Sequence, residues 1–127
     1  KRNVFISFAM EDLDEVNLLR AHAKNEKSDI EFNDYSVREP YDSERAEYIR
    51  QKITERIERA SVTVVYLSES TPQSEWVKWE VEKSLSLGKR VVAMYASDKP
   101  PSQLPAWVSE KKIGLVPWKN LADELGK

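Results

Sequence analysis

Apolar positions along the chain follow two different periods. Three short, nearly continuous apolar runs are typical of strands buried on both faces of a parallel sheet: residues 3–8, 61–67 and 90–95. Three longer stretches carry apolar residues three and four positions apart, the spacing of one helix face: 12–24, 43–60 and 74–85. Weaker patterns predict an edge strand, a last strand and a terminal helix: residues 30–32, 112–117 and 118–125.

The predicted strands and helices alternate, and this alternation indicates the fold class. A strand–helix–strand order implies a parallel sheet with helices on both of its faces. Five strands in a chain of this size suit the strand order 2-1-3-4-5. We therefore predict an α/β protein, a flavodoxin-like three-layer sandwich around a five-stranded parallel sheet, forming a single domain over residues 1–127. Because the chain starts at Lys1 rather than Met, a domain cut from a longer chain is compatible with it.

Composition narrows the classes of partner and chemistry. The 127 residues are 40% hydrophobic and 33% charged, with a net charge of −2 and no cysteine. The absence of cysteine excludes disulfides, thiolate metal sites and a cysteine nucleophile, and it fits a reducing compartment. The net charge offers no general attraction to nucleic acid, and no apolar run approaches the roughly 18 residues of a membrane span. We expect a cytoplasmic protein with neither nucleic acid nor membrane among its partners.

The helix predicted over residues 74–85 carries an unusual set of side chains. Its apolar stripe consists of Val77, Val81, Ser84 and Leu85. The spacing predicts that Trp76 and Glu80 lie side by side on another face, next to Trp79. Two interpretations stay open for this face: an aromatic surface and a carboxylate that together bind a flat ligand, or tryptophans that cover the sheet beside an ordinary surface charge.

The predicted topology indicates where a ligand would bind. In such sheets, ligands bind beyond the carboxyl ends of the strands, where the strand order reverses between strands one and three. Three loops and the start of the 74–85 helix would build that edge: residues 7–10, 33–38 and 68–73. This places Trp76 and Glu80 near the expected crevice on grounds of topology alone.

The sequence lacks the residues that several familiar functions of this fold require. Glu11 and Asp12 would repel the phosphate of a flavin mononucleotide, and a phosphoacceptor receiver needs an aspartate where Ser68 follows the third strand. The three glycines, Gly88, Gly114 and Gly126, form neither Gly-x-Gly-x-x-Gly nor a P-loop. No residues have metal-ligand spacing, so we expect no metal.

Three segments together resemble a known family. They are Val4-Phe5-Ile6-Ser7-Phe8, Asn33-Asp34-Tyr35-Ser36 and Ser74-x-Trp76-Val77-x-Trp79-Glu80. The sequence resembles TIR-like domains from Val4 to about Tyr95, and it is most similar to the bacterial and archaeal TIR-like group that includes the TIR component of the Thoeris antiphage system.

The resemblance implies an activity and a site. Enzymatic TIR domains cleave the nicotinamide–ribose bond of NAD, and many cyclise or transfer the ADP-ribosyl group to make signal molecules. By this match Glu80 is the catalytic glutamate and Trp76 helps to wall the pocket. Ser7 and Phe8 border the nicotinamide ribose, and Asp34 and Ser36 begin the loop that closes over the ligand. NAD enters as substrate, and no cofactor is implied.

Two functions follow as expectations. The first is an enzyme of the NAD glycohydrolase or ADP-ribosyl cyclase type that makes an ADP-ribose-derived signal in antiphage defence. The alternative is a non-catalytic TIR-like interaction or assembly domain in signalling. Both imply self-association or pairing with another TIR or effector protein. The loop after Asn33 departs from many family members because it is charged and contains Pro40.

Overall fold

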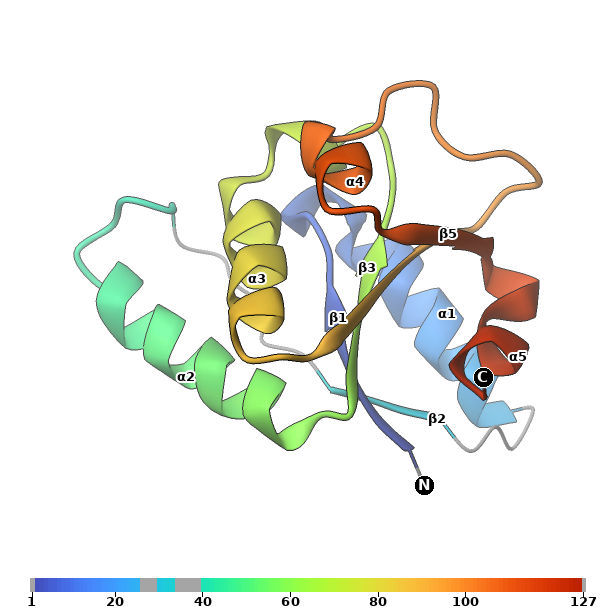
Figure 1. The fold of residues 1–127 in the computed structure, drawn as a ribbon, viewed down its shortest axis with the longest axis horizontal. Helices are drawn as coiled ribbons and strands as arrows, with labels where there is room; N and C mark the ends of the chain where they lie inside the picture. The colour runs from blue at the N-terminus through green and yellow to red at the C-terminus, as the bar shows by residue number, and fades with distance from the viewer. Residues whose placement is uncertain (1, 26–29, 34–39, 127) are drawn as a thin grey trace.

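An all-parallel, five-stranded sheet forms the centre of the molecule (Figure 1). The computed structural model describes residues 2–25, 30–33 and 40–126. The strands are β1 (Arg2–Ser7), β2 (Ile30–Asn33), β3 (Val62–Tyr66), β4 (Arg90–Tyr95) and β5 (Gly114–Pro117). Their order is β2-β1-β3-β4-β5, as predicted, so β3 is central and β2 lies at an edge.

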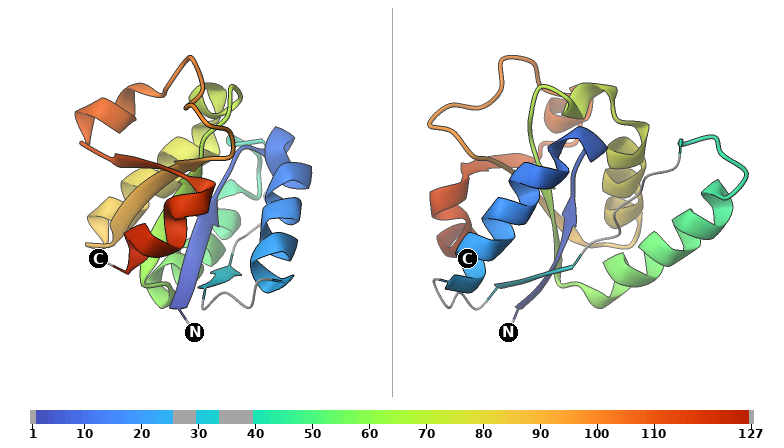
Figure 2. Two further views of the ribbon diagram at one scale, coloured as in Figure 1. Left: turned by 90° about the vertical axis from the view of Figure 1, so that its right-hand side faces the viewer. Right: turned by 180° about the vertical axis from the view of Figure 1, so that it is seen from behind.

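Helices cover both faces of the sheet (Figure 2). The helices are α1 (Leu13–Asn25), α2 (Ala46–Arg59), α3 (Glu75–Ser86), α4 (Ala106–Glu110) and α5 (Leu121–Leu125). Three 3₁₀ turns accompany them: η1 (Met10–Asp12), η2 (Thr71–Gln73) and η3 (Trp118–Asn120). Helices α1 and α5 pack on one face of the sheet, and α2, α3 and α4 pack on the other. The predicted three-layer sandwich is therefore confirmed.

Strand β1 divides its side chains between the two layers. Val4 and Ile6 belong to the core under α1 and α5, whereas Phe5 belongs to the core under α2. Because side chains alternate along a strand, Ser7 shares the face of Phe5 and points toward α2 and α3. The last residue of β1 therefore presents a hydroxyl to the helix layer that contains Glu80.

Helix α3 begins and ends at residues whose chemistry suits those positions. Ser74 caps its start, because its Oγ accepts a hydrogen bond from the Val77 backbone N–H at 3.2 Å. Gly88 follows its end with a φ of 74°, a left-handed conformation in which residues with a side chain are strained. Ser74 and Gly88 therefore mark the two ends of the helix.

A chain of two buried hydroxyls fixes α3 on β3. Ser84 Oγ donates to the backbone carbonyl of Glu80 at 2.7 Å, and Thr63 Oγ1 lies 2.8 Å from Ser84 Oγ. Both side chains are fully buried. Since Ser84 has a single hydroxyl proton and gives it to Glu80, the Thr63 hydroxyl must be the donor to Ser84. Thr63 thus anchors, through Ser84, the turn of α3 that carries Glu80.

Two elements differ from the sequence-based prediction. Helix α2 begins at Ala46 rather than at residue 43, because turns closed by Pro40 and Ser43 carbonyls precede it. The short helix α4 follows the proline-rich loop and was not predicted. Its five residues are too few to show a period, yet they bury Trp107 and Val108 against the core beneath α3.

The hydroxyl chain predicts a difference between two serines of α3. Ser84→Ala would leave the buried Thr63 donor unpaired, so we expect the free energy of unfolding to fall by about 1–3 kcal/mol. Ser86→Ala is the matched control, because exposed Ser86 bonds only the Lys83 carbonyl, and its effect should stay within about 0.5 kcal/mol. Urea denaturation measures both.

A double variant extends the same test. Thr63→Val combined with Ser84→Ala removes donor and acceptor together, so its loss should be smaller than the sum of the two single losses. If Ser84→Ala is as neutral as Ser86→Ala, the hydroxyl chain does not anchor α3.

Candidate functional site

A buried serine–glutamate pair lies at the carboxyl end of β1. Ser7 Oγ donates a hydrogen bond to Glu80 Oε1 at 2.5 Å, joining residues 73 positions apart. The exposed fraction of Ser7 is 1% and that of Glu80 is 4%. An ionisable side chain is rarely buried to this degree unless it is paired or functional. This pair is therefore the centre of the candidate site.

The predicted face of Glu80 was wrong. Glu80 lies on the buried face of α3 with Val77, Val81 and Ser84, not on a face separate from that stripe, and half-buried Trp76 borders it one turn earlier. Positions 77, 80, 81 and 84 follow the i, i+3, i+4, i+7 spacing of one helix face, so the signal was present in the sequence. The interpretation of Glu80 as an ordinary surface charge is excluded by its burial.

Trp76 lies one turn before Glu80, between α3 and α2. Its ring meets Tyr41 edge-on, with ring centroids 5.1 Å apart, and its other aromatic neighbour is Trp79 at 6.3 Å. Both tryptophans are half-buried against the α2 core that contains Ile53. The guanidinium carbon of Arg50 lies 4.6 Å from the Tyr41 ring centroid and 5.6 Å from that of Trp76. Sequence analysis missed Arg50 and Tyr41, since no local motif distinguishes them.

The remaining sequence-predicted residues do not gather around Glu80 in the same way. The Phe8 ring packs against the core under α1, beneath the guanidinium of Arg20 at 5.8 Å. It therefore lies on the opposite face of the sheet from Glu80. Asp34 and Ser36 fall outside the described residues.

A second group of polar side chains joins α1 to the end of β3. Ser68 Oγ donates to Asp12 Oδ2, and Tyr66 Oη donates to Glu15 Oε2 at 2.5 Å. Burial raises the pKa of Asp12 above its ordinary value, and the hydrogen bond from Ser68 opposes that shift. Burial, reinforced by the Glu15 carboxylate, also raises the pKa of Tyr66, so this phenol stays protonated as a donor at neutral pH. These groups hold the start of α1 in place.

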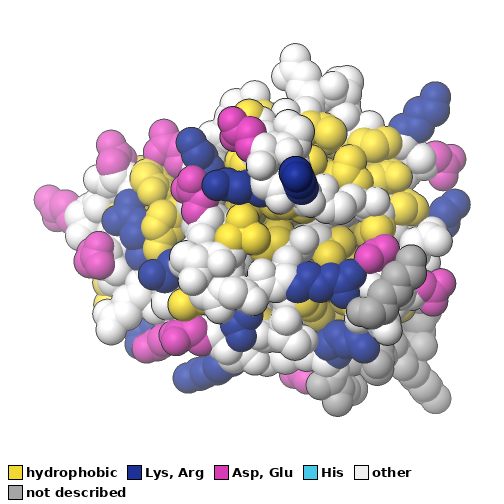
Figure 3. Space-filling view, viewed as in Figure 1, with side chains coloured by type: hydrophobic (Ala, Val, Ile, Leu, Met, Phe, Trp, Pro, Cys, Tyr) yellow, Lys and Arg dark blue, Asp and Glu magenta, His cyan; other side chains and the backbone are white. Residues whose placement is uncertain are grey.

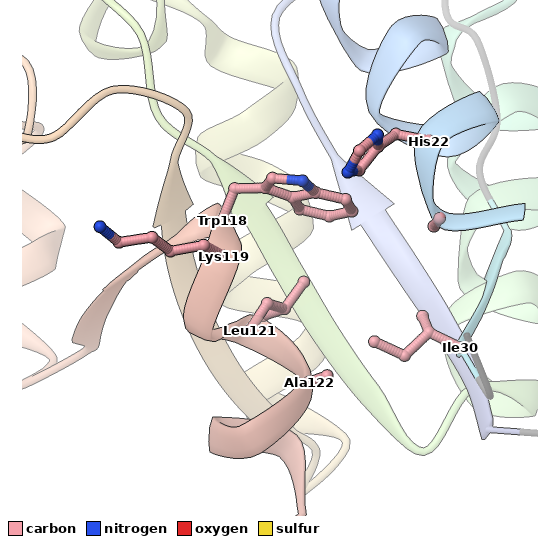
Figure 4. Close-up of a pocket in the computed structure, with 7 residues that line it drawn as sticks. His22, Ile30, Trp118, Lys119, Leu121 and Ala122 are labelled. Carbon is pink, nitrogen blue, oxygen red and sulfur yellow. The ribbon is translucent and has the colours of Figure 1, made fainter. Parts of the chain in front are cut away.

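Two cavities lie on the α1 side of the sheet. One, of about 490 Å³, opens beyond β3 and β4 and is lined by Glu15, Tyr66, Ser68 and Tyr95 among others. The other, of about 190 Å³, lies between α1, β2 and α5 (Figure 4). In this second cavity Trp118 faces His22 and Ile30, while the Lys119 ammonium points away. Neither cavity is lined by Ser7 or Glu80, so each is distinct from the candidate site.

Within residues 2–25, 30–33 and 40–126, no three His, Cys, Asp or Glu side chains come together as metal ligands would. In that part of the chain, no helix combines the length and the apolar character needed to traverse a bilayer.

Solved structures with the same fold include both TIR domains and enzymes. The TIR domain of the Toll-related receptor TRR-2 from Hydra magnipapillata matches with a TM-score of 0.61 and 17% identity, covering 98% of each chain. A 2-desoxiribosyltransferase from Leishmania mexicana matches with a TM-score of 0.55 and 17% identity, over 89% of this chain and 73% of that chain. The Clostridium botulinum CMP N-glycosidase BcmB matches with a TM-score of 0.52 and 11% identity, over 99% of this chain and 100% of that chain. At these identities the likeness establishes the fold alone.

Sequence comparison identifies the family. Curated protein sequences gave no match. The family model described as "Thoeris protein ThsB, TIR-like domain" matches residues 5–100, which include the end of β1, the Ser7–Glu80 pair and α3. The expected resemblance is thereby confirmed, and the chain belongs to the family of ThsB TIR-like domains.

Proposed function

We propose that this TIR-like domain cleaves the nicotinamide–ribose bond of NAD and so makes an ADP-ribose-derived signal in antiphage defence. The observation that carries the proposal is the buried hydrogen bond between Ser7 and Glu80 at the carboxyl end of β1. Glu80 is the proposed catalytic residue. Ser7 and Trp76 are proposed to bind the nicotinamide ribose and to wall the pocket, and Asp34 and Ser36 remain proposed parts of the binding site. Phe8 is not kept in this proposal, because its ring packs on the opposite face of the sheet.

One carboxylate is sufficient for this chemistry. As the C1′–N bond breaks, its electron pair moves to the pyridinium nitrogen, and nicotinamide leaves as a neutral molecule without needing a general acid. Positive charge develops at C1′ and the ring oxygen, and the Glu80 carboxylate stabilises this charge or accepts a hydrogen bond from a ribose hydroxyl. In hydrolysis, water adds to C1′ and loses a proton, giving ADP-ribose. The site therefore needs neither histidine nor cysteine.

The surroundings of Glu80 suit such a role. Ser7 holds one carboxylate oxygen, and the Thr63–Ser84 chain holds the Glu80 backbone. A carboxylate fixed in a poorly hydrated place needs little reorganisation when charge develops beside it. Two proteins of the same fold, the CMP N-glycosidase and the 2-desoxiribosyltransferase, are named for reactions of glycosyl groups, and this supports the proposal by analogy.

We expect the active form of the domain to be assembled with other copies or partners. The TIR domains of the activated Roq1 resistosome share this fold, with a TM-score of 0.54 and 18% identity over 98% of this chain and 70% of that chain. Exposed apolar side chains here include Leu18 on α1 and Met10 in η1. We propose that the domain self-associates or pairs with another TIR or effector protein, so activity is best measured on assembled protein.

The central role of Glu80 predicts a large loss of rate. Glu80→Gln keeps the size of the side chain but removes its charge, so nicotinamide release from NAD should fall by about 10²-fold or more. Glu82→Gln is the matched control, because Glu82 lies on the exposed face of the same helix. Chromatography of nicotinamide after incubation with NAD checks both. Equal release by wild type and Glu80→Gln would remove Glu80 from the mechanism.

Ser7 should act through Glu80. Ser7→Ala removes a donor from a buried carboxylate, so we expect nicotinamide release to fall by roughly 10-fold or more. In the Glu80→Gln background the same change should cause little further loss, because the charge that Ser7 orients is already gone. A full additional loss in the double variant would show that Ser7 acts independently of Glu80.

A further inference from the structure

A dinucleotide substrate brings a charge that the proposed catalytic residues do not balance. The diphosphate of NAD carries two negative charges, whereas Glu80 is acidic and Ser7 and Trp76 are neutral. The surface over α2 and α3 mixes acidic, basic and hydrophobic side chains rather than carrying one sign of charge (Figure 3). A diphosphate must therefore be recognised by particular cations close to the site.

Arg50 on α2 is placed for this role. Its guanidinium stacks against Tyr41 and Trp76, at 4.6 Å and 5.6 Å from their ring centroids. Its Nη2 also donates to the Tyr41 backbone carbonyl at 3.2 Å. These contacts fix the guanidinium beside Trp76, the proposed pocket wall, while 25% of the Arg50 side chain stays exposed.

Most hydrogen-bonding capacity of Arg50 remains for a ligand. A guanidinium has five N–H donors in a rigid fork that matches two phosphate oxygens. Among the described contacts of Arg50, one hydrogen bond goes to Tyr41, and the ion pair with Glu47 is long, at 3.7 Å. The Glu47 side chain is 93% exposed, so water and salt weaken that pair. A phosphate can therefore replace Glu47 as the ion-pair partner of Arg50 at little cost in free energy.

Other cations on α2, and Arg45 just before it, have different partners. Arg56 donates to Asn33 Oδ1 at 2.9 Å, at the end of β2. Arg45 and Lys52 lie over the ring of exposed Tyr48, at 5.7 Å and 5.4 Å. Among the contacts that the structure describes for this helix, Arg50 is thus the cation that lies over the rings of Tyr41 and Trp76.

The spacing also fits a dinucleotide. Trp76 and Glu80 are one helical turn apart, about 6 Å along α3. If C1′ of the nicotinamide ribose lies at Glu80, the diphosphate is attached through the 5′ carbon of the same sugar. That carbon is a few bonds from C1′, so the distance between C1′ and the diphosphate is on the order of one helical turn. The guanidinium carbon of Arg50 lies 5.6 Å from the ring centroid of Trp76, which is one turn of α3 before Glu80.

We propose that Arg50 is the diphosphate-binding residue of this site and selects dinucleotides over uncharged nucleosides. The inference rests on the proposed function for the identity of the substrate. Tyr41 and Trp76 act as positioning residues, because the guanidinium carbon lies over both rings and one N–H donates to the Tyr41 carbonyl, which leaves other N–H groups for the phosphate oxygens.

Calorimetric titration with ADP-ribose tests the assignment without requiring turnover. Arg50→Gln should weaken ADP-ribose binding by about 10- to 100-fold at low salt, and Arg50→Lys should fall between it and wild type. Arg59→Gln is the matched control, because Arg59 is an exposed arginine in the last turn of the same helix, and it should leave the affinity unchanged.

The salt dependence of the Arg50→Gln effect shows whether Arg50 contacts the ligand or only supports the structure. If Arg50 contacts the diphosphate, the difference between wild type and Arg50→Gln should shrink at about 0.5 M salt, since exposed charges are then screened. Three results would overturn the assignment: no ADP-ribose binding to wild type, equal affinity in Arg50→Gln, or the same loss at both salt concentrations.

Nicotinamide release, measured in parallel, keeps the two proposals apart. Arg50-dependent ADP-ribose binding without any release would contradict the proposed cleavage but support Arg50. Release that persists while Arg50→Gln binds ADP-ribose normally would contradict Arg50 alone.

Discussion

Burial of the Glu80 carboxylate is the constraint on which the site depends. Removing an ionisable group from water costs several kcal/mol unless partners compensate for the lost hydration. Here Ser7 supplies a hydrogen bond from the end of β1, and the Thr63–Ser84 hydroxyls hold the carbonyl of the same residue. Central strands β1 and β3 therefore both contact the helical turn that carries Glu80. A change in the position of α3 would break these contacts together, so fold and site are coupled.

The two faces of the sheet have different roles in this arrangement. Under α1 and α5 the core is mainly aliphatic, and its polar groups, Asp12 with Ser68 and Glu15 with Tyr66, pair with one another at the rim. Under α2 and α3, polar and aromatic side chains lie near the turns of α3 that carry Trp76 and Glu80. The Tyr41 and Trp76 rings meet edge-on there, and the guanidinium carbon of Arg50 lies over both. Aromatic rings and a cation beside a buried carboxylate can together bind a substrate that is charged and partly aromatic.

The sequence predicted the fold better than the details of the site. Apolar runs alternating with helical stripes are sufficient to predict a parallel sheet and its order, because handedness and short connections leave few alternatives. The same patterns correctly predicted that α3 begins at the edge of the sheet formed by the carboxyl ends of the strands. The prediction for Glu80 was wrong because its i, i+4 spacing from Trp76 favoured a face separate from the apolar stripe, although its spacing also matches Val77 and Val81. The Ser7–Glu80 bond, the Thr63–Ser84 chain and the Arg50 stack join residues distant in sequence, so local patterns could not predict them. The short helix α4 has no measurable period.

A crystal structure of the domain with a carbocyclic analogue of NAD, in which the nicotinamide–ribose bond cannot be cleaved, tests the role of Glu80 most directly. We expect C1′ of the analogue at about 3.5 Å from the Glu80 carboxylate, with the diphosphate against Arg50. A nicotinamide ribose bound instead in the cavity beyond β3 and β4, or between α1 and α5, would contradict it.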